Sequence, residues 1–153
     1  MKELKTEIII RAPRSGVWQV LTDFNRYAEW NPFITSSQGK AVVGTQLTNQ
    51  MQSGDKTFTF KPKLTQVDPE QYLEWLGHLA IPGLFDGRHY FRLEAIEPEL
   101  TQLTQGERFS GILSGLILKR IAEDTRHGFI AMNRALQQRA EAMQTTTVSS
   151  SRR

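Results

Sequence analysis

The chain has 153 residues, of which 39% are hydrophobic and 23% charged, and its formal net charge is +3. This length and composition are typical of one globular domain that can bury a core without covalent crosslinks. Arg152 and Arg153 at the C terminus supply two of the three units of net positive charge, and no basic stripe runs through the rest of the chain. We therefore do not expect nucleic-acid binding, which needs concentrated positive charge.

The absence of cysteine excludes disulfides, thiolate catalysis and cysteine-ligated metals. No run of eighteen apolar residues is present, which argues against stable insertion in a membrane. The first apolar run, residues 8–10, is too short for the core of a secretory signal. Together these features predict a cytoplasmic protein.

The N-terminal part predicts a strand followed by two short helices. Residues 6–10 are apolar and β-branched, as in a strand. Pro13 suits the first turn of a helix, and apolar residues at helical spacing follow between positions 17 and 24. A second short helical turn contains Trp30 and ends at Pro32.

Residues 34–109 alternate in polarity and carry turn signals about every ten residues, which predicts an antiparallel meander. Tight turns at residues 54–55 and 69–70 fix the pairing of the strands beside them. A shift of one residue would turn each apolar set outward, so the parity is well determined. The predicted pairs are Met51 with Phe58, Asn49 with Phe60, Phe60 with Leu79, and Leu64 with Trp75.

The third predicted hairpin brings two candidate catalytic residues together. A three-residue loop at residues 97–99 places Leu93 opposite Leu103 and Phe91 opposite Gln105. The same register places His89 opposite Glu107 on the inward face, where directly opposed side chains can touch. This pair is interpreted in three ways: a structural cross-strand contact, an anchor for a ligand hydroxyl group, or an acid and base for proton transfer.

The last segment, residues 112–143, carries a stripe of apolar residues three, four and seven apart, which predicts one long amphipathic helix. Residues 144–153 lack this periodicity, and we expect a disordered tail after a single domain of residues 1–143.

Several short motifs occur in the predicted helices and strands: Ala-Pro, Val-Trp, Leu-Thr-Asp and Tyr-Ala-Glu-Trp-Asn-Pro within residues 12–32, Gly-Arg-His-Tyr-Phe at residues 87–91, and Glu-Arg-Phe-Ser-Gly at residues 107–111. Together they resemble the START-like (SRPBCC) superfamily, in its group of polyketide cyclase/dehydrase and lipid-transport proteins. The resemblance implies an α+β helix-grip fold, with a seven-stranded antiparallel sheet wrapped around the long C-terminal helix. It also implies a deep apolar cavity between the sheet and that helix.

In such a fold, large aromatic side chains and a few polar ones would line the cavity, as in sites for small apolar or aromatic molecules. The alternative is that these rings simply fill the core. The candidate ligand-binding residues, beside His89 and Glu107, are Trp30, Phe33, Asn49, Phe60, Trp75, Phe91 and Phe129.

An unusually apolar loop around Pro82, Gly83, Leu84 and Phe85 is a candidate lid over the cavity mouth, with Gly83 and Gly87 as hinges. Alternatively, the loop packs back on the end of the sheet. Both interpretations rest on the same observation, which is that this loop is apolar where a polar loop would be expected.

The three histidines, His78, His89 and His127, do not form a metal-binding spacing, and no serine-hydrolase motif is present. We expect neither a metal nor another cofactor. Three functions remain open: a binding protein for a small hydrophobic or aromatic metabolite or lipid, a cyclase/dehydrase-like enzyme that uses His89 and Glu107, and a homodimeric interaction module that pairs through a sheet edge.

Overall fold

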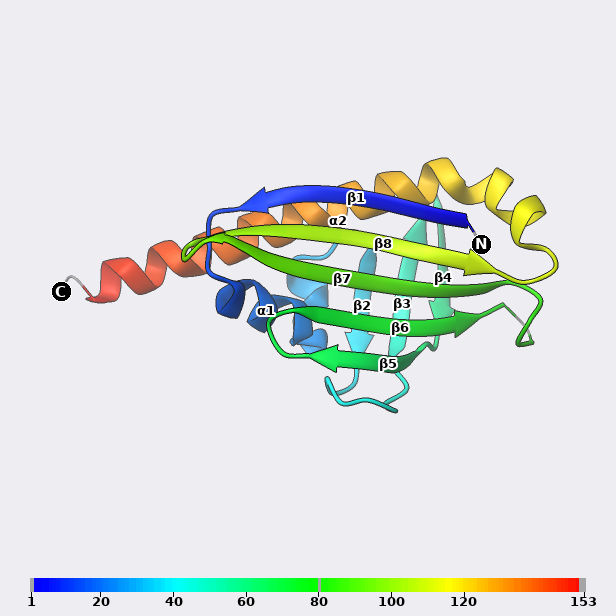
Figure 1. Cartoon of the computed structure of the whole chain (residues 1–153), viewed down its shortest axis with the longest axis horizontal. Helices are drawn as coiled ribbons and strands as arrows, with labels where there is room; N and C mark the ends of the chain where they lie inside the picture. The colour runs from blue at the N-terminus through cyan, green and yellow to red at the C-terminus, as the bar shows by residue number, and fades with distance from the viewer. Residues whose placement is uncertain (1, 80, 152–153) are drawn as a thin grey trace.

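The computed structural model describes residues 2–79 and 81–151, and it describes side chains up to residue 144 (Figure 1). Within these residues the chain forms eight strands, two α-helices and one 3-10 helix. The first elements are β1 (Lys2–Ile10), α1 (Arg14–Thr22) and the 3-10 helix η1 (Phe24–Glu29). They are followed by β2 (Ile34–Gln38), β3 (Thr48–Ser53), β4 (Lys56–Phe60), β5 (Lys63–Asp68), β6 (Tyr72–His78), β7 (Asp86–Glu97), β8 (Leu100–Ser110) and α2 (Ser114–Ser151).

The strands form two antiparallel sheets instead of the single seven-stranded sheet that the sequence predicted. The larger sheet has the order β1-β8-β7-β6-β5, and the smaller one has the order β2-β3-β4. The ladder breaks between β4 and β5 at Pro62, which has no N–H group to donate. Near this break an isolated bridge pairs Gln46 with Lys63, and Leu47 N–H donates to the Pro62 carbonyl over 2.8 Å. The α+β class with its long C-terminal helix is confirmed, whereas the strand count and the single sheet were wrong.

The hairpin registers explain which side chains meet in the interior. The structure confirms Met51 opposite Phe58, Asn49 opposite Phe60, Leu64 opposite Trp75, Leu93 opposite Leu103, Phe91 opposite Gln105 and His89 opposite Glu107. The predicted pair of Phe60 and Leu79 was wrong, because β4 and β6 lie in different sheets.

Two of these registers depend on bulges that the sequence did not reveal. In the β7–β8 hairpin Glu97 pairs with Leu100, so the loop is one residue shorter than predicted. An irregularity between Ala95 and Glu97 restores the predicted offset for the rest of the ladder. A similar irregularity between Leu64 and Gln66 compensates for a longer β5–β6 turn.

Helix α1 packs on the C-terminal half of α2 at one end of the larger sheet (Figure 1). Val17, Val20 and Leu21 are its buried residues, and their spacing of three and four residues places them on one face. Phe24 and Tyr27 of η1 are also buried, and their rings meet edge to face with centroids 5.6 Å apart. The short helices therefore close this end of the core.

Helix α2 has 38 residues and contacts β1 and β8 of the larger sheet and β3 of the smaller one. The buried residues of its inner face are Leu118, Phe129, Met132, Asn133, Leu136 and Ala140. Its backbone continues as helix to Ser151, past the strands (Figure 1), whereas the sequence predicted a disordered tail from residue 144. Extending a formed helix needs no new nucleation, which accounts for helix in a segment without apolar periodicity. Arg152 and Arg153 lie outside the described residues.

None of the helices described in residues 2–79 and 81–151 is long and apolar enough to cross a membrane.

Strands β4 and β5 are edge strands of their sheets. A homodimer formed through such an edge, and a cytoplasmic location, stay predictions.

Candidate functional site

The predicted pair of His89 and Glu107 meets on the inner face of the larger sheet. Because β7 and β8 run antiparallel with His89 directly opposite Glu107, the two side chains leave the sheet at the same point. His89 Nδ1 lies 3.2 Å from Glu107 Oε1. The imidazole side chain is 1% exposed and the carboxylate side chain 14% exposed. Solvent therefore reaches the pair from the side of the carboxylate.

Aromatic rings surround the imidazole. Trp75 of β6 stacks on His89 with ring centroids 4.9 Å apart and an angle of 28° between the planes. Phe91 lies 5.0 Å away along the same strand, and Phe129 of α2 meets the imidazole edge to face at 4.8 Å. These contacts fix the plane of the imidazole ring in an apolar environment.

Three polar residues that the sequence did not predict as site residues continue from His89 into the core. His89 Nε2 lies 2.8 Å from Gln105 Oε1. The Gln105 amide nitrogen donates to Asn133 Oδ1 over 2.6 Å and to the Phe129 carbonyl over 3.3 Å. Asn133 Nδ2 donates to the Thr6 hydroxyl over 2.9 Å, and that hydroxyl donates to the Gln105 carbonyl over 2.9 Å. One buried hydrogen-bonded network thus joins β1, β7, β8 and α2.

The sequence contained a signal for these residues. Gln105 has the inward parity of Glu107, and Thr6 has the inward parity of Ile8 and Ile10. Asn133 follows Phe129 by four residues and therefore lies on the apolar face of the helix. A polar residue at an inward position of three separate elements indicates a shared polar contact, because isolated buried polar groups are costly.

The structure brings five of the other predicted residues to the interior, at different distances from the pair. Trp75, Phe91 and Phe129 contact His89 directly. Phe33 packs on Phe129 with centroids 5.6 Å apart. Asn49 is 1% exposed, and its Oδ1 accepts a hydrogen bond from Ser37 over 2.5 Å. The aromatic side chains expected to line a hollow are thus in contact with one another.

Phe60 lies between the two sheets. Its ring covers Gly77 of β6 so closely that a Cβ atom at position 77 would overlap it. Gly77 therefore allows the smaller sheet to approach the larger one at this point. Phe60 is half-buried, and Phe58 two residues earlier is 47% exposed, so this edge of the interior is close to solvent.

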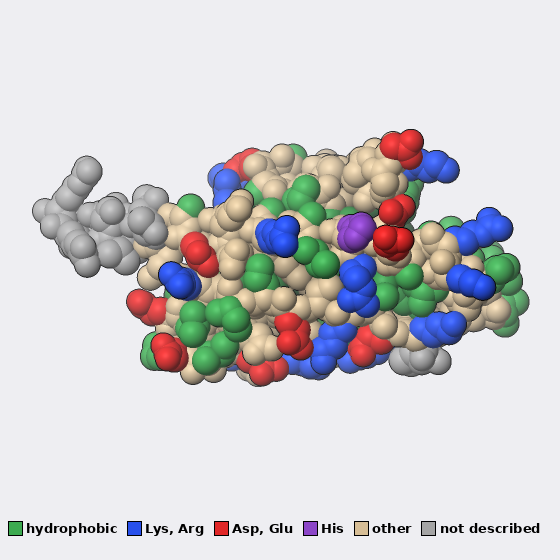
Figure 2. All heavy atoms as spheres, turned by 90° about the horizontal axis from the view of Figure 1, so that it is seen from above, with side chains coloured by type: hydrophobic (Ala, Val, Ile, Leu, Met, Phe, Trp, Pro, Cys, Tyr) green, Lys and Arg blue, Asp and Glu red, His purple; other side chains and the backbone are tan. Residues whose placement is uncertain are grey.

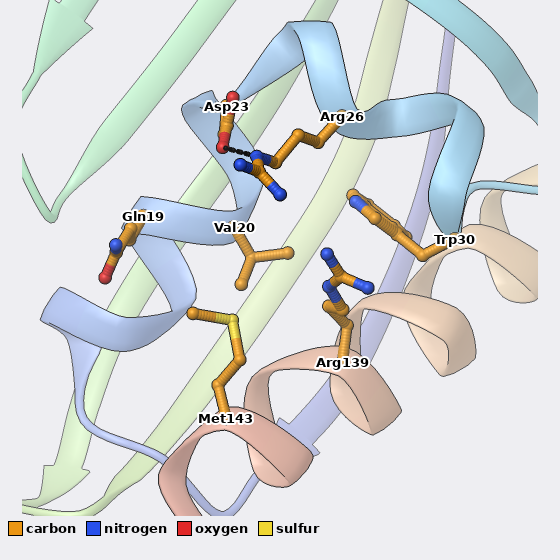
Figure 3. A pocket seen from close by; sticks show the side chains of 7 residues that line it. All are labelled: Gln19, Val20, Asp23, Arg26, Trp30, Arg139 and Met143. Carbon is orange, nitrogen blue, oxygen red and sulfur yellow. Dashed lines mark ion pairs between the residues drawn. The ribbon is translucent and has the colours of Figure 1, made fainter. Parts of the chain in front are cut away.

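Trp30 lies outside this cluster. Its ring packs against Tyr27 with centroids 5.1 Å apart, and it lines a pocket of about 220 Å³ between the short helices and α2 (Figure 3). Arg26 and Arg139 extend into the same pocket and are paired, respectively, with Asp23 over 3.3 Å and with Glu29 over 2.6 Å. No other predicted site residue lines this pocket.

The candidate lid is held to the end of the larger sheet. Ile112 N–H donates to the Gly83 carbonyl over 3.1 Å, and Leu113 N–H donates to the Leu84 carbonyl over 2.9 Å. Phe85 stacks on Phe109 with centroids 5.5 Å apart. Pro82 is exposed. A role of this loop as a lid stays a prediction.

Gly87, the second expected hinge, lies inside β7 and is paired with Gly77 and Phe109, so it does not belong to the loop. Gly83 does belong to it and has a φ of 89°, which favours glycine.

Exposed apolar side chains gather around the loop and the start of α2, namely Leu79, Ile81, Ile112 and Leu116. Figure 2 shows apolar side chains with Lys and Arg at the end of the molecule opposite the C terminus.

Ionisable groups with shifted pKa values lie away from the His89–Glu107 pair. Burial, helped by the hydrogen bond to Glu3, raises the pKa of Tyr90 to about 12 on the outer face of the larger sheet. A hydrogen bond from His78 over 2.7 Å lowers the pKa of Asp86, which also accepts the Gly83 N–H. Asp86 thereby anchors the candidate lid to the start of β7.

Within the part of the chain that the structure describes, no group of three or more histidine, aspartate or glutamate residues is placed to hold a metal ion. His78 pairs with Asp86, and His127 is exposed on α2.

Two sheets that close on a long C-terminal helix, with an imidazole–carboxylate pair among aromatic rings, define a helix-grip-like domain. The family model described as polyketide cyclase / dehydrase and lipid transport matches residues 1–146. The chain belongs to this family. No curated protein matches the chain.

Solved structures with the same fold share little sequence with this chain. The Zhui aromatase/cyclase from Streptomyces sp. R1128 has a TM-score of 0.74 at 18% identity, covering 92% of this chain and 93% of its own. Protein MLL2253 from Mesorhizobium loti has a TM-score of 0.73 at 19% identity, covering 92% and 98%. A START superfamily protein from Mycobacterium smegmatis has a TM-score of 0.71 at 16% identity, covering 92% and 98%. At these identities the likeness concerns the fold.

Proposed function

We propose that the protein binds a small hydrophobic or aromatic molecule, a metabolite or a lipid, between the larger sheet and α2. The observation that carries this proposal is the buried His89–Glu107 pair inside a wall of aromatic rings. A core built only for stability gains little from ionisable groups, because their removal from water is costly. A ligand that contacts the pair gives a reason for keeping it.

A second polar group supports a ligand with an oxygen acceptor. The Nδ2 atom of Asn49 is buried and has no hydrogen-bond partner among the described residues. An unsatisfied buried donor costs about 1–3 kcal/mol. A ligand carbonyl or hydroxyl oxygen that accepts this N–H would recover part of that cost. Asn49 therefore serves as a second anchor, on β3 of the smaller sheet.

Access to the interior requires that packed rings move apart. The carboxylate of Glu107 already reaches solvent, and the half-buried Phe60 lies at the edge between the sheets. The loop with Pro82, Leu84 and Phe85 lies at the same end as the start of β7. We propose that a ligand enters here and that the loop acts as its lid.

The alternative function is a cyclase/dehydrase-like reaction without a cofactor. It is supported by the direct contact of an imidazole with a carboxylate in an apolar environment, an arrangement suited to proton transfer on an enolic or phenolic substrate. His89 and Glu107 would then be the catalytic residues. Turnover of a bound compound, followed by mass spectrometry, separates this function from binding alone.

The direct test is to purify the native protein, identify co-purifying small molecules by mass spectrometry, and measure binding of aromatic polyketides, sterols and fatty acids. We expect His89→Ala to weaken binding about tenfold, because the imidazole that contacts the aromatic rings and pairs with Glu107 is lost. His127→Ala, which changes an exposed histidine of α2, is the matched control and should bind as the wild type does. Equal binding by wild type and a correctly folded His89→Ala protein would refute the proposal.

A further inference from the structure

The orientation of the Gln105 amide is fixed by its neighbours. A backbone carbonyl carries no hydrogen, so the Gln105 atom that lies 3.3 Å from the Phe129 carbonyl must be the amide nitrogen. The same nitrogen donates to Asn133 Oδ1. The remaining amide atom, Oε1, can only accept, and it faces His89 Nε2. His89 therefore carries a hydrogen on Nε2.

This assignment determines what lies between His89 and Glu107. With Nε2 protonated, a neutral imidazole would present the lone pair of Nδ1 to the carboxylate oxygen 3.2 Å away. Two acceptors at this distance in an apolar interior repel each other, so one proton must be shared between Nδ1 and Oε1. The pair is then neutral as a whole, either as imidazolium with carboxylate or as imidazole with carboxylic acid.

The second carboxylate oxygen lies over a glycine. A Cβ atom at position 87 would overlap Glu107 Oε2 and would lie 3.0 Å from its Cδ atom. Oε2 has no hydrogen-bond partner among the described residues, and the Glu107 side chain is partly exposed. Because the shared proton lies on the side of Oε1, Oε2 is an acceptor.

We propose that Glu107 Oε2, in the space left by Gly87, accepts a hydrogen bond from a hydroxyl group of the ligand, with Gln105 as the positioning residue that keeps one proton on the pair. The ligand class is a neutral aromatic or alicyclic molecule with a hydroxyl group. An ether has no proton to donate, and a carboxylate would meet the negative side of the pair. This assignment rests on the proposed binding function and specifies its ligand.

The first test needs no ligand. Long-range ¹H–¹⁵N NMR of the imidazole ring reports which nitrogen of His89 carries a proton. We expect a proton on Nε2 in the wild type and its loss, with a mixture of tautomers, in Gln105→Met, which has a similar shape and no amide. An unprotonated Nε2 in the wild type would overturn the assignment of the shared proton.

The second test compares 2-naphthol, 2-methoxynaphthalene and 2-naphthoate by calorimetry. A hydrogen bond to the carboxyl oxygen predicts that the wild type binds the naphthol about tenfold more tightly than the ether. Gly87→Ala displaces the carboxylate and should abolish this preference, whereas Gly16→Ala, where a Cβ meets only ordinary contacts, should retain it.

Equal affinity of the wild type for naphthol and ether, or an unchanged preference in Gly87→Ala, would overturn the hydroxyl subsite while leaving the binding function intact. If none of the three compounds and no sterol binds, although fatty acids do, the proposed ligand class is wrong. If nothing binds at all, both the proposed function and its ligand class fall, and the NMR result alone decides the protonation of the pair.

Discussion

Replacing Asn133 by Leu tests whether the buried network stabilises the fold. The substitution keeps the branched shape of the side chain and removes the acceptor that lies 2.6 Å from the Gln105 amide nitrogen. That nitrogen retains the Phe129 carbonyl as a partner, so one of its two hydrogens loses its acceptor. The Thr6 hydroxyl still donates to the Gln105 carbonyl.

One unsatisfied buried donor costs about 1–3 kcal/mol. For a chain of this length, each kcal/mol lowers the melting temperature by about 2–4 °C. Urea denaturation and thermal unfolding followed by circular dichroism measure both quantities. Gln138→Leu, at an exposed position on the same helix, is the control and should change stability by less than about 0.5 kcal/mol. Asn133→Leu protein as stable as this control would refute the role of the network.

Three further predictions concern other parts of the structure. Gly128→Ala should lower stability, because a Cβ atom at this position overlaps the buried ring of Phe33. Overpacking costs about 1–3 kcal/mol, which exceeds the gain of about 1 kcal/mol in helix propensity. A more stable variant would contradict this packing. Folding favours the neutral form of Tyr90, so its contribution to the free energy of unfolding is present below pH 10 and is lost as the pH rises through about 12. The Tyr90→Phe protein should not show this loss of stability when its denaturation is measured at alkaline pH. Because the pKa of Asp86 is lowered in the folded protein, its contribution to stability is present above pH 3.8 and is lost as the pH falls through its pKa in the folded protein. Asp86→Asn should therefore speed amide exchange at Gly83 at neutral pH, and unchanged exchange would contradict the anchoring of the loop.

The contact of His89 with Glu107 could be predicted because turn positions and strand parity determine which residues face each other. Both signals are local, and they need no knowledge of the helix that covers the sheet. The predicted pairing of His89 with Glu107 is correct although the loop is shorter than expected, because the irregularity near Ala95 offsets the difference. Bulges depend on local twist and packing, and for that reason the sequence did not show them.

The remaining parts of the site depend on how distant elements meet. The helical spacing of Phe129 and Asn133 was visible, but not the height at which α2 crosses the sheet, which brings Asn133 to Gln105. Trp30, which directly follows η1, lies apart from His89 and lines the pocket beside α1 and α2. Its role in ligand binding stays a prediction. The division into two sheets occurs at Pro62, which has no N–H group to continue the ladder from β4 to β5.

The most direct test of ligand binding beside the buried pair is the NMR signal of the three histidine rings during titration with 2-naphthol. His78 and His127 are internal controls, since the first pairs with Asp86 at the edge and the second is exposed on α2. We predict that the ring resonances of His89 shift in a saturable manner while those of the two controls stay in place. Saturable binding that leaves His89 unchanged would contradict a ligand site at His89 and Glu107.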